Sequence, residues 1–219
     1  MTPIYRIIDI TNLASICEHD GIWCKSSVET LGIKYTNIAH TNIMDKRAKI
    51  KVQRRYPPIR QVAKGGVLAD YVPFYFAPRS PMLCSISHGK VEGYPQGQNG
   101  VIHFVSSAEE VKNKGLDFAF TDGHAIMTLS EFYDDLEDLH HIDWEIMNAR
   151  FWGDTIEDND RSRRREAEFL VRRFFPWTLV SEISVISNSI AEEVRTIIKE
   201  SEHQPIVTIR PGWYYSIGE

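Results

Sequence analysis

Residues 65–83 have the sequence GGVLADYVPFYFAPRSPML, and this stretch decides the fold. After a glycine pair, four of the six residues at 71–76 are aromatic. Aromatic and β-branched residues bounded by Gly and Pro are typical of a buried strand. Pro73 predicts an edge or bulged strand, because proline cannot donate to the hydrogen-bond ladder. The rings either pack in the core or form a wall for a flat ligand ring beside a wet cleft.

The composition is that of a globular protein. The chain has 219 residues, enough for one substantial core, and we expect a single domain over residues 1–219. No apolar run approaches the ~20 residues that span a bilayer, and the N-terminus carries no signal peptide, so no membrane partner is expected. The three cysteines, Cys17, Cys24 and Cys84, lack CxxC spacing, which argues against a disulfide framework or zinc site. These features predict a cytoplasmic protein.

Basic residues are concentrated in two segments of an acidic chain. The net charge is −5, yet residues 41–66 carry eight Lys or Arg and one Asp, a net +7 that leaves −12 for the rest. A second cluster comprises Arg161, Arg163, Arg164, Arg165, Arg172 and Arg173. A charge run is commonly a solvated face. The segregation of charge instead favours two surfaces that bind a polyanion.

The order of the predicted elements indicates an α+β fold. Strands are predicted at residues 4–8, 71–76, 101–106, 117–121, 167–171, 182–187 and 206–209. Helices are predicted at residues 11–19, 44–51, 107–115, 130–139, 143–152 and 189–199, with a helical turn at 81–88. Residues 34–66 otherwise lack periodicity and form a candidate substrate loop. Strands and helices mix without a repeating βαβ period.

One carboxylate stands out among the chemically active residues. The sequence contains no GxGxxG, P-loop, HExxH or GxSxG motif, and its histidines show no metal-ligand spacing, so no metal is expected. Glu168 lies in the apolar run at 167–171, directly after an arginine-rich segment. An acid in an apolar strand is costly unless it meets a partner or a ligand. Glu168 is therefore either half of a buried salt bridge with a neighbouring arginine or a functional group.

Several motifs together resemble the DarT family, the toxins of DarTG toxin–antitoxin systems that ADP-ribosylate single-stranded DNA. The resemblance runs from Tyr5 to Tyr215, through residues 5–8 (YRII), 46–48 (KRA), 65–83, 120–124 (FTDGH), 167–171 (AEFLV) and 212–215 (GWYY). It implies the ADP-ribosyltransferase fold, a split mixed β core with flanking helices and a long basic substrate loop. It also implies transfer of ADP-ribose from NAD to a DNA base, expected to be thymine, with release of nicotinamide. A DarG-like macrodomain antitoxin that reverses or blocks the modification is the implied partner.

The resemblance implies roles for individual residues. Glu168 matches the catalytic glutamate, which accepts a hydrogen bond from the ribose and stabilises its developing positive charge. Arg47 matches an arginine needed for base modification, and we expect it to stabilise the deprotonated base because guanidinium itself stays protonated. The residues expected to contact NAD are Arg6, Asn12, Tyr71, Phe74, Tyr75 and Ser80. Those expected to contact DNA are Lys46, Lys49, Lys51, Arg54, Arg55, Arg60, His124 and Arg163.

Two other classes of function are compatible with parts of the sequence. A related transferase could modify protein, or hydrolyse NAD with water as the acceptor. A non-catalytic nucleic-acid-binding module would explain the basic loop at 34–66, but it would leave Glu168 without a purpose.

Overall fold

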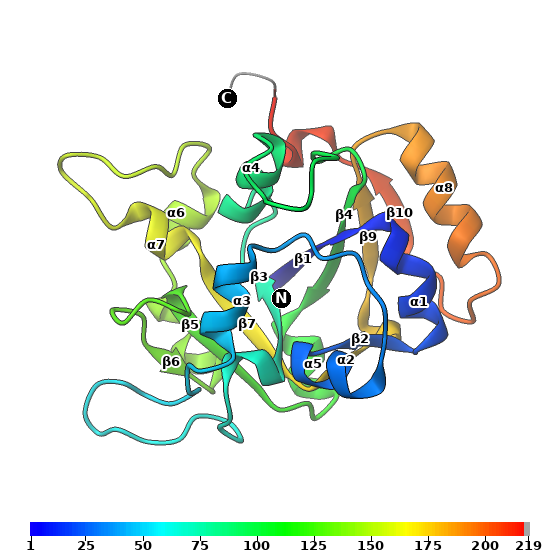
Figure 1. The fold of residues 1–219 in the computed structure, drawn as a ribbon. Helices are drawn as coiled ribbons and strands as arrows, with labels where there is room; N and C mark the ends of the chain where they lie inside the picture. Colours follow the sequence, from blue (N-terminus) through cyan, green and yellow to red (C-terminus); the bar gives the residue numbers. More distant parts are fainter. Residues whose placement is uncertain (217–219) are drawn as a thin grey trace.

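The computed structural model describes residues 1–216 of the chain. Its strands are β1 (Pro3–Asp9), β2 (Gly21–Trp23), β3 (Tyr71–Tyr75), β4 (Val101–Ser107), β5 (Phe118–His124), β6 (Phe132–Tyr133), β7 (Ala167–Arg172), β8 (Phe174–Pro176), β9 (Glu182–Val185) and β10 (Ile206–Ile209). Eight of them form one sheet in the order β10-β9-β4-β1-β3-β7-β5-β6, and β2 and β8 form a small second sheet (Figure 1). Strands β9 and β10 pair in parallel and the other pairs in the described residues are antiparallel, so the sheet is mixed.

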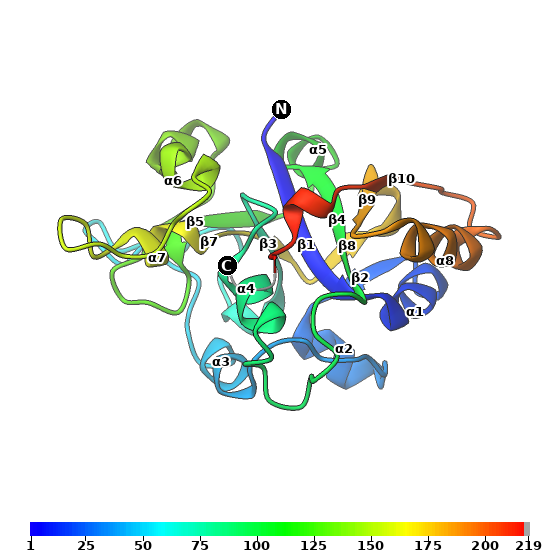
Figure 2. The same cartoon turned by 90° about the horizontal axis from the view of Figure 1, so that it is seen from above.

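Short helices flank the strands on both sides. They are α1 (Leu13–Glu18), α2 (Lys25–Leu31), α3 (Thr41–Arg47), α4 (Pro81–Ser87), α5 (Ala108–Asn113), α6 (Trp144–Asn148), α7 (Arg161–Arg165) and α8 (Asn188–Ile198). In Figure 2, α2 and α3 lie on one side of the strands while α5 and α6 lie on the other. The expected α+β fold with a mixed β core is confirmed. Within residues 1–216 no helix has both the length and the apolar character needed to cross a membrane.

The sheet is split between β1 and β3. These strands pair only at Tyr5 and Tyr75, whereas β1 pairs with β4 along its whole length. Beside that single pair, the Arg6 guanidinium donates from Nη1 to the Pro73 carbonyl at 2.8 Å. The prediction that Pro73 marks an edge strand is wrong, because β3 lies between β1 and β7. Its missing N–H is tolerated because that side of Pro73 faces the split, where there is no ladder to interrupt.

The aromatic residues of β3 serve both of the expected purposes, one on each face of the strand. Phe74 is fully buried and packs against Phe175, with ring centroids 4.7 Å apart. Tyr71, Pro73 and Tyr75, which alternate with it, line a cavity. Alternation along one strand therefore joins the core to the candidate site.

Residues 130–139 do not form the predicted helix. Phe132 and Tyr133 form β6 against β5, and a 3₁₀ helix, Leu136–His141, follows. Both aromatic residues are buried, and Tyr133 stacks on Phe120 with centroids 5.2 Å apart. Burial of these two rings outweighs the helix propensity of the acidic residues around them.

Other elements differ from the predictions in their boundaries. The basic helix expected at 44–51 is α3, which lies earlier, and the helix expected at 143–152 is the shorter α6. Helix α8 is capped by Ser187, whose side chain accepts from the Ile190 N–H, and not by Ser189. Residues 48–66 form the expected loop, held by isolated bridges at Lys51–Val67 and Gln53–Gln61.

Candidate active site

A cavity of about 230 Å³ lies beside the split in the sheet. Helices α2 and α3 and the segment between them supply one wall, and β1 and β3 supply another. The polar side chains of its lining include five from distant parts of the chain: Arg6, Arg47, Tyr75, His124 and Glu168. Such a cleft with convergent polar groups is the usual form of a ligand site.

Glu168 is held in place by donors from two different segments. Its side chain projects from β7 and the residue is only 2 % exposed. Oε2 accepts from Arg47 Nη1 at 2.7 Å, and Oε1 accepts from the backbone N–H of Ala125 at 3.1 Å. Burial alone raises the pKa of this carboxyl, but the Arg47 charge and the hydrogen bond from His124 lower it to about 2. Glu168 is therefore a buried, ionised carboxylate.

Two buried arginine donors at the cavity have no protein partner. Arg47 Nη2 and Arg6 Nε are both buried without a hydrogen bond among the described residues. Burial, together with the nearby charge of Arg47, lowers the pKa of Arg6 to about 10, so the Arg6 guanidinium stays charged near neutral pH. Two cations beside the Glu168 carboxylate give these three residues a net positive charge. Unpaired buried donors of this kind suit an anionic ligand, such as a pyrophosphate.

His124 lies between two carboxylates. Its Nδ1 is 3.4 Å from Glu168 Oε1, and its Nε2 is 3.2 Å from Glu166 Oε2. Burial lowers the pKa of His124, but the hydrogen bond to Glu168 and the charges of Glu166 and Glu168 outweigh it and raise the pKa overall. Burial, and secondarily the Glu168 charge, raises the pKa of Glu166. His124, which is expected to contact DNA, thus also belongs to the polar network of Glu168.

The residues expected to contact NAD occupy several different environments. Tyr71 and Tyr75 line the cavity, although the Tyr71 hydroxyl already donates to the Gly65 carbonyl at 2.7 Å. Asn12 lines it too, and its amide exchanges two hydrogen bonds with the backbone of Thr36.

Two of the expected NAD contacts are corrected by the structure. The ring of Phe74 lies in the core, on the other face of β3 from the cavity. Ser80 is 1 % exposed, and its hydroxyl caps α4 by accepting from the Leu83 N–H. Neither residue lines the cavity. The sequence motif contains both because it encodes a strand and a helix cap in addition to cavity residues.

The basic residues expected to contact DNA divide into exposed lysines and engaged arginines. Lys46, Lys49 and Lys51 are exposed. The Arg54 guanidinium lies over the Tyr133 ring, 5.6 Å from its centroid.

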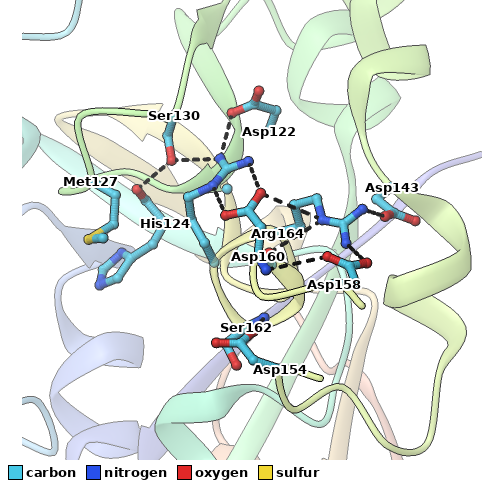
Figure 3. A network of polar contacts seen from close by, with 12 residues as sticks. Asp122, His124, Met127, Ser130, Asp143, Asp154, Asp158, Asp160, Ser162 and Arg164 are labelled. Carbon is cyan, nitrogen blue, oxygen red and sulfur yellow. Dashed lines mark hydrogen bonds and ion pairs between the residues drawn. The ribbon is translucent and has the colours of Figure 1, made fainter. Parts of the chain in front are cut away.

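Three arginines expected to hold phosphates instead bond within the protein. Arg60 pairs with Asp134 at 3.0 Å. Arg55 donates to the carbonyls of residues 125, 127 and 130. Arg163 pairs with Asp160 at 2.7 Å. Figure 3 labels Asp122, Ser130 and Asp160, the acidic and hydroxyl groups that Arg163 contacts. Each of these three arginines therefore has an internal acceptor, and its expected contact with a DNA phosphate stays a prediction.

Sequence reasoning missed the contribution of Ala125. This residue acts through its backbone N–H on Glu168, and a backbone donor leaves no signal in side-chain chemistry. It also missed the partner of Glu168. The expected salt bridge involved a neighbouring arginine, whereas Arg47 lies 121 residues away along the chain.

Comparison with known proteins gives one consistent result over nearly the whole chain. Residues 5–215 match the family described as ssDNA thymidine ADP-ribosyltransferase, DarT. The chain is 42 % identical over 216 residues to a DNA ADP-ribosyl transferase of Thermus sp. (strain 2.9), covering 98 % of this chain and 96 % of the relative. A DNA ADP-ribosyl transferase of Escherichia coli O127:H6 is 32 % identical, with 97 % and 93 % covered.

Solved structures agree with these sequence matches. Thermus sp. 2.9 DarT in complex with ADP-ribosylated ssDNA superimposes with a TM-score of 0.87 at 41 % identity, covering 98 % of this chain and 96 % of that chain. The same Thermus protein in complex with NAD⁺ superimposes with a TM-score of 0.82 at 40 % identity, covering 98 % of both chains.

Proposed function

The chain belongs to the DarT family of single-stranded-DNA thymidine ADP-ribosyltransferases, and from that premise we propose that it transfers ADP-ribose from NAD to thymine in single-stranded DNA and releases nicotinamide. The observation that carries this proposal is Glu168. A buried, ionised carboxylate held by Arg47 and Ala125 at a positive cavity is suited to stabilise positive charge on a bound sugar.

The cavity fits NAD in its charge. Arg6 Nε and Arg47 Nη2 are buried donors without partners, and a dinucleotide brings pyrophosphate and ribose oxygens that can accept from them. Tyr75 supplies an aromatic surface on the same lining. When the bond between nicotinamide and ribose breaks, positive charge develops on the ribose. Glu168 faces this charge with its carboxylate already in place, which avoids reorganisation during the reaction.

Arg47 has a role that follows from its charge. The ring nitrogen of thymine attacks the ribose carbon as nicotinamide leaves, and its proton passes to water. Negative charge develops on the ring as the proton departs and is neutralised when the new bond is complete. A guanidinium does not act as the base under ordinary conditions, because it stays protonated. Arg47 instead stabilises the charge on the thymine ring, while its Nη1 keeps Glu168 oriented.

Exposed lysines are the proposed phosphate contacts. Lys46 directly precedes Arg47 in the last turn of α3, and Lys49 and Lys51 follow Arg47 along the chain. All three are exposed and lie close along the chain to a residue of the cavity. Their positive charge attracts the DNA backbone independently of its sequence.

The biological setting is also part of the proposal. We place the protein in the cytoplasm. We also propose a single domain over residues 1–219, because strands from both ends of the chain share one sheet. Its cysteines are free, as expected in a reducing compartment. As the resemblance to DarTG toxins implies, the partner is a macrodomain antitoxin that reverses or blocks the modification.

The proposal is tested by mass spectrometry of oligonucleotides after incubation with NAD. A single strand containing all four bases should gain one ADP-ribose on thymine, and a thymine-free strand of equal length should gain none. Glu168→Gln serves as the inactive control. Label on protein alone, or nicotinamide release without any DNA adduct, would favour the alternative activities and overturn the assignment.

A further inference from the structure

The peptide that links His124 to Ala125 is fixed at both ends. Its N–H, from Ala125, donates to Glu168 Oε1 at 3.1 Å. Its C=O, from His124, accepts from the Ser130 hydroxyl at 2.8 Å. Both groups belong to one planar unit, so a rotation that breaks one bond also breaks the other. Ser130 is fully buried, so water does not compete with the His124 carbonyl for its hydroxyl.

Arg163 supports Ser130 from one side. Its Nη1 donates to Ser130 Oγ at 3.1 Å and to Asp122 Oδ1 at 3.3 Å, while Nε and Nη2 each donate to the Asp160 carboxylate at 2.7 Å. The three acceptor residues are labelled in Figure 3. Gly123 leaves the space that this guanidinium occupies, because a Cβ at that position would lie 2.2 Å from Nη1. All three nitrogens of Arg163 are thus used inside the protein.

Arg55 supports the same turn from the basic loop. Its Nη2 donates to the Ala125 carbonyl at 2.9 Å, and its Nη1 donates to the Ser130 carbonyl at 3.1 Å and to the Met127 carbonyl. The Glu131 carboxylate, which belongs to the turn, also bonds the backbone of the basic loop. It accepts from the backbone N–H groups of Arg55 and Tyr56, both at 2.8 Å.

These contacts form a closed path around Glu168. One oxygen of its carboxylate meets Arg47, and the other meets the turn at residues 124–131. Residues 48–66 follow Arg47 directly and are bonded to this turn through Arg55. Moving Arg55 or Arg163 onto a DNA phosphate would remove bonds that hold the turn.

We propose that Ser130, Arg55 and Arg163 are positioning residues, which hold the turn at 124–131 so that the Ala125 N–H meets the carboxylate of Glu168. They act on the reaction through this turn and do not contact DNA phosphates. The proposal rests on the proposed function, because ADP-ribose transfer is one of its readouts.

The first test separates positioning from phosphate binding. Ser130→Ala removes the hydrogen bond to the His124 carbonyl and the one from Arg163 Nη1, and we expect kcat to fall on the order of tenfold. Arg55→Lys keeps the charge but cannot reach three carbonyls, and we expect a loss on the order of a hundredfold from the displaced turn. In both variants the affinity for single-stranded DNA and its salt dependence should match the wild type.

A matched control accompanies these variants. Ser87→Ala removes a hydroxyl that donates to the Cys84 carbonyl at 2.8 Å in α4, away from the turn, and should leave kcat unchanged. Wild-type kcat for Arg55→Lys, or a loss confined to DNA affinity, would overturn the proposal and restore Arg55 as a phosphate contact.

The second test does not depend on transfer activity. Proteins labelled with carboxyl-¹³C glutamate are titrated by NMR, and Glu168→Gln assigns the signal. The groups that face Glu168, namely Arg6, Arg47, Tyr75, His124 and Glu166, are unchanged in the variants. Loss of the Ala125 N–H should therefore raise the pKa of Glu168 in Ser130→Ala and Arg55→Lys, but not in Ser87→Ala.

The two tests distinguish the two proposals. A raised pKa of Glu168 in the variants, in a wild-type protein that modifies no DNA, supports the positioning role while the proposed function fails. An unchanged pKa in both variants, in a wild-type protein that does modify DNA, overturns the positioning role alone.

Discussion

Arg47 Nη1 lies 2.7 Å from Glu168 Oε2, and both side chains are nearly excluded from water. The pair joins the last residue of α3 to the second residue of β7. Breaking a buried pair by removing one charge costs more than the pair contributes, because the remaining charge stays buried. The same contact therefore bears on stability and on catalysis, and the variants below separate these effects.

Glu168→Gln should abolish transfer while leaving the protein folded. The amide keeps an oxygen that can accept from Arg47, but it carries no negative charge to stabilise the sugar. We expect a loss in kcat on the order of a hundredfold or more, measured by single-turnover transfer to a thymine-containing oligonucleotide. The matched control is Glu182→Gln. It alters the ion pair between Glu182, the first residue of β9, and Arg210, and it should retain activity. Near wild-type transfer by Glu168→Gln would reduce Glu168 to a structural ion-pair member.

Arg47→Lys should impair transfer more than it impairs DNA binding. Lysine retains the positive charge, but it lacks the second guanidinium nitrogen, which in Arg47 is buried and unpartnered. We expect kcat to fall on the order of a hundredfold, because the geometry at the base is lost. Fluorescence titration with single-stranded DNA should show an unchanged salt dependence. A variant with normal kcat and weakened DNA affinity would make Arg47 a phosphate contact instead.

Replacing Lys46, Lys49 and Lys51 together by Gln should weaken DNA binding in a salt-dependent way. Each lost phosphate contact should flatten the slope of log affinity against log salt by about 0.7. Arg60→Gln is the control on the same loop, because Arg60 already pairs with Asp134, and its slope should equal that of the wild type. Equal slopes for the triple variant and the wild type would remove these lysines from the DNA path.

The contribution of His124 to stability should fall as the pH rises. Folding raises the pKa of His124, because its bonds to Glu168 and Glu166 outweigh the effect of burial. Its stabilising effect is therefore complete below the pKa in the unfolded chain, about 6.5, and is lost as the pH passes through the higher folded value. Glu168 stays ionised across this range, since its pKa is lowered to about 2.

Urea unfolding of the wild type and of His124→Gln, from about pH 5.5 to about pH 9, measures this effect. The difference in the free energy of unfolding between the two proteins should be largest at the acid end. A difference that grows with pH would show that burial dominates and that the carboxylates do not bind the protonated ring.

The sequence predicted the central strands well because each is long enough to carry its own pattern. The aromatic run of β3 and the apolar run of β7 are examples. Strands β2 and β8 have three residues each and were not predicted, since they exist only by pairing with each other. Arg55 and Arg163 show the same limit at the site. Their charge is visible in the sequence, but the carbonyls and carboxylates that bind them are brought close only by the fold.

The strand order also determines when the protein becomes active during its synthesis. Strand β1 pairs with β4 along its whole length, so the first strand made finds its main partner only after residues 101–107 have been made. Arg6 and Arg47 precede the loop that leads into β4, whereas His124 and Glu168 follow it. A nascent or truncated chain that ends before β7 therefore has a cavity lining without its carboxylate. Synthesis therefore has to pass β7 before the cavity gains the carboxylate of Glu168.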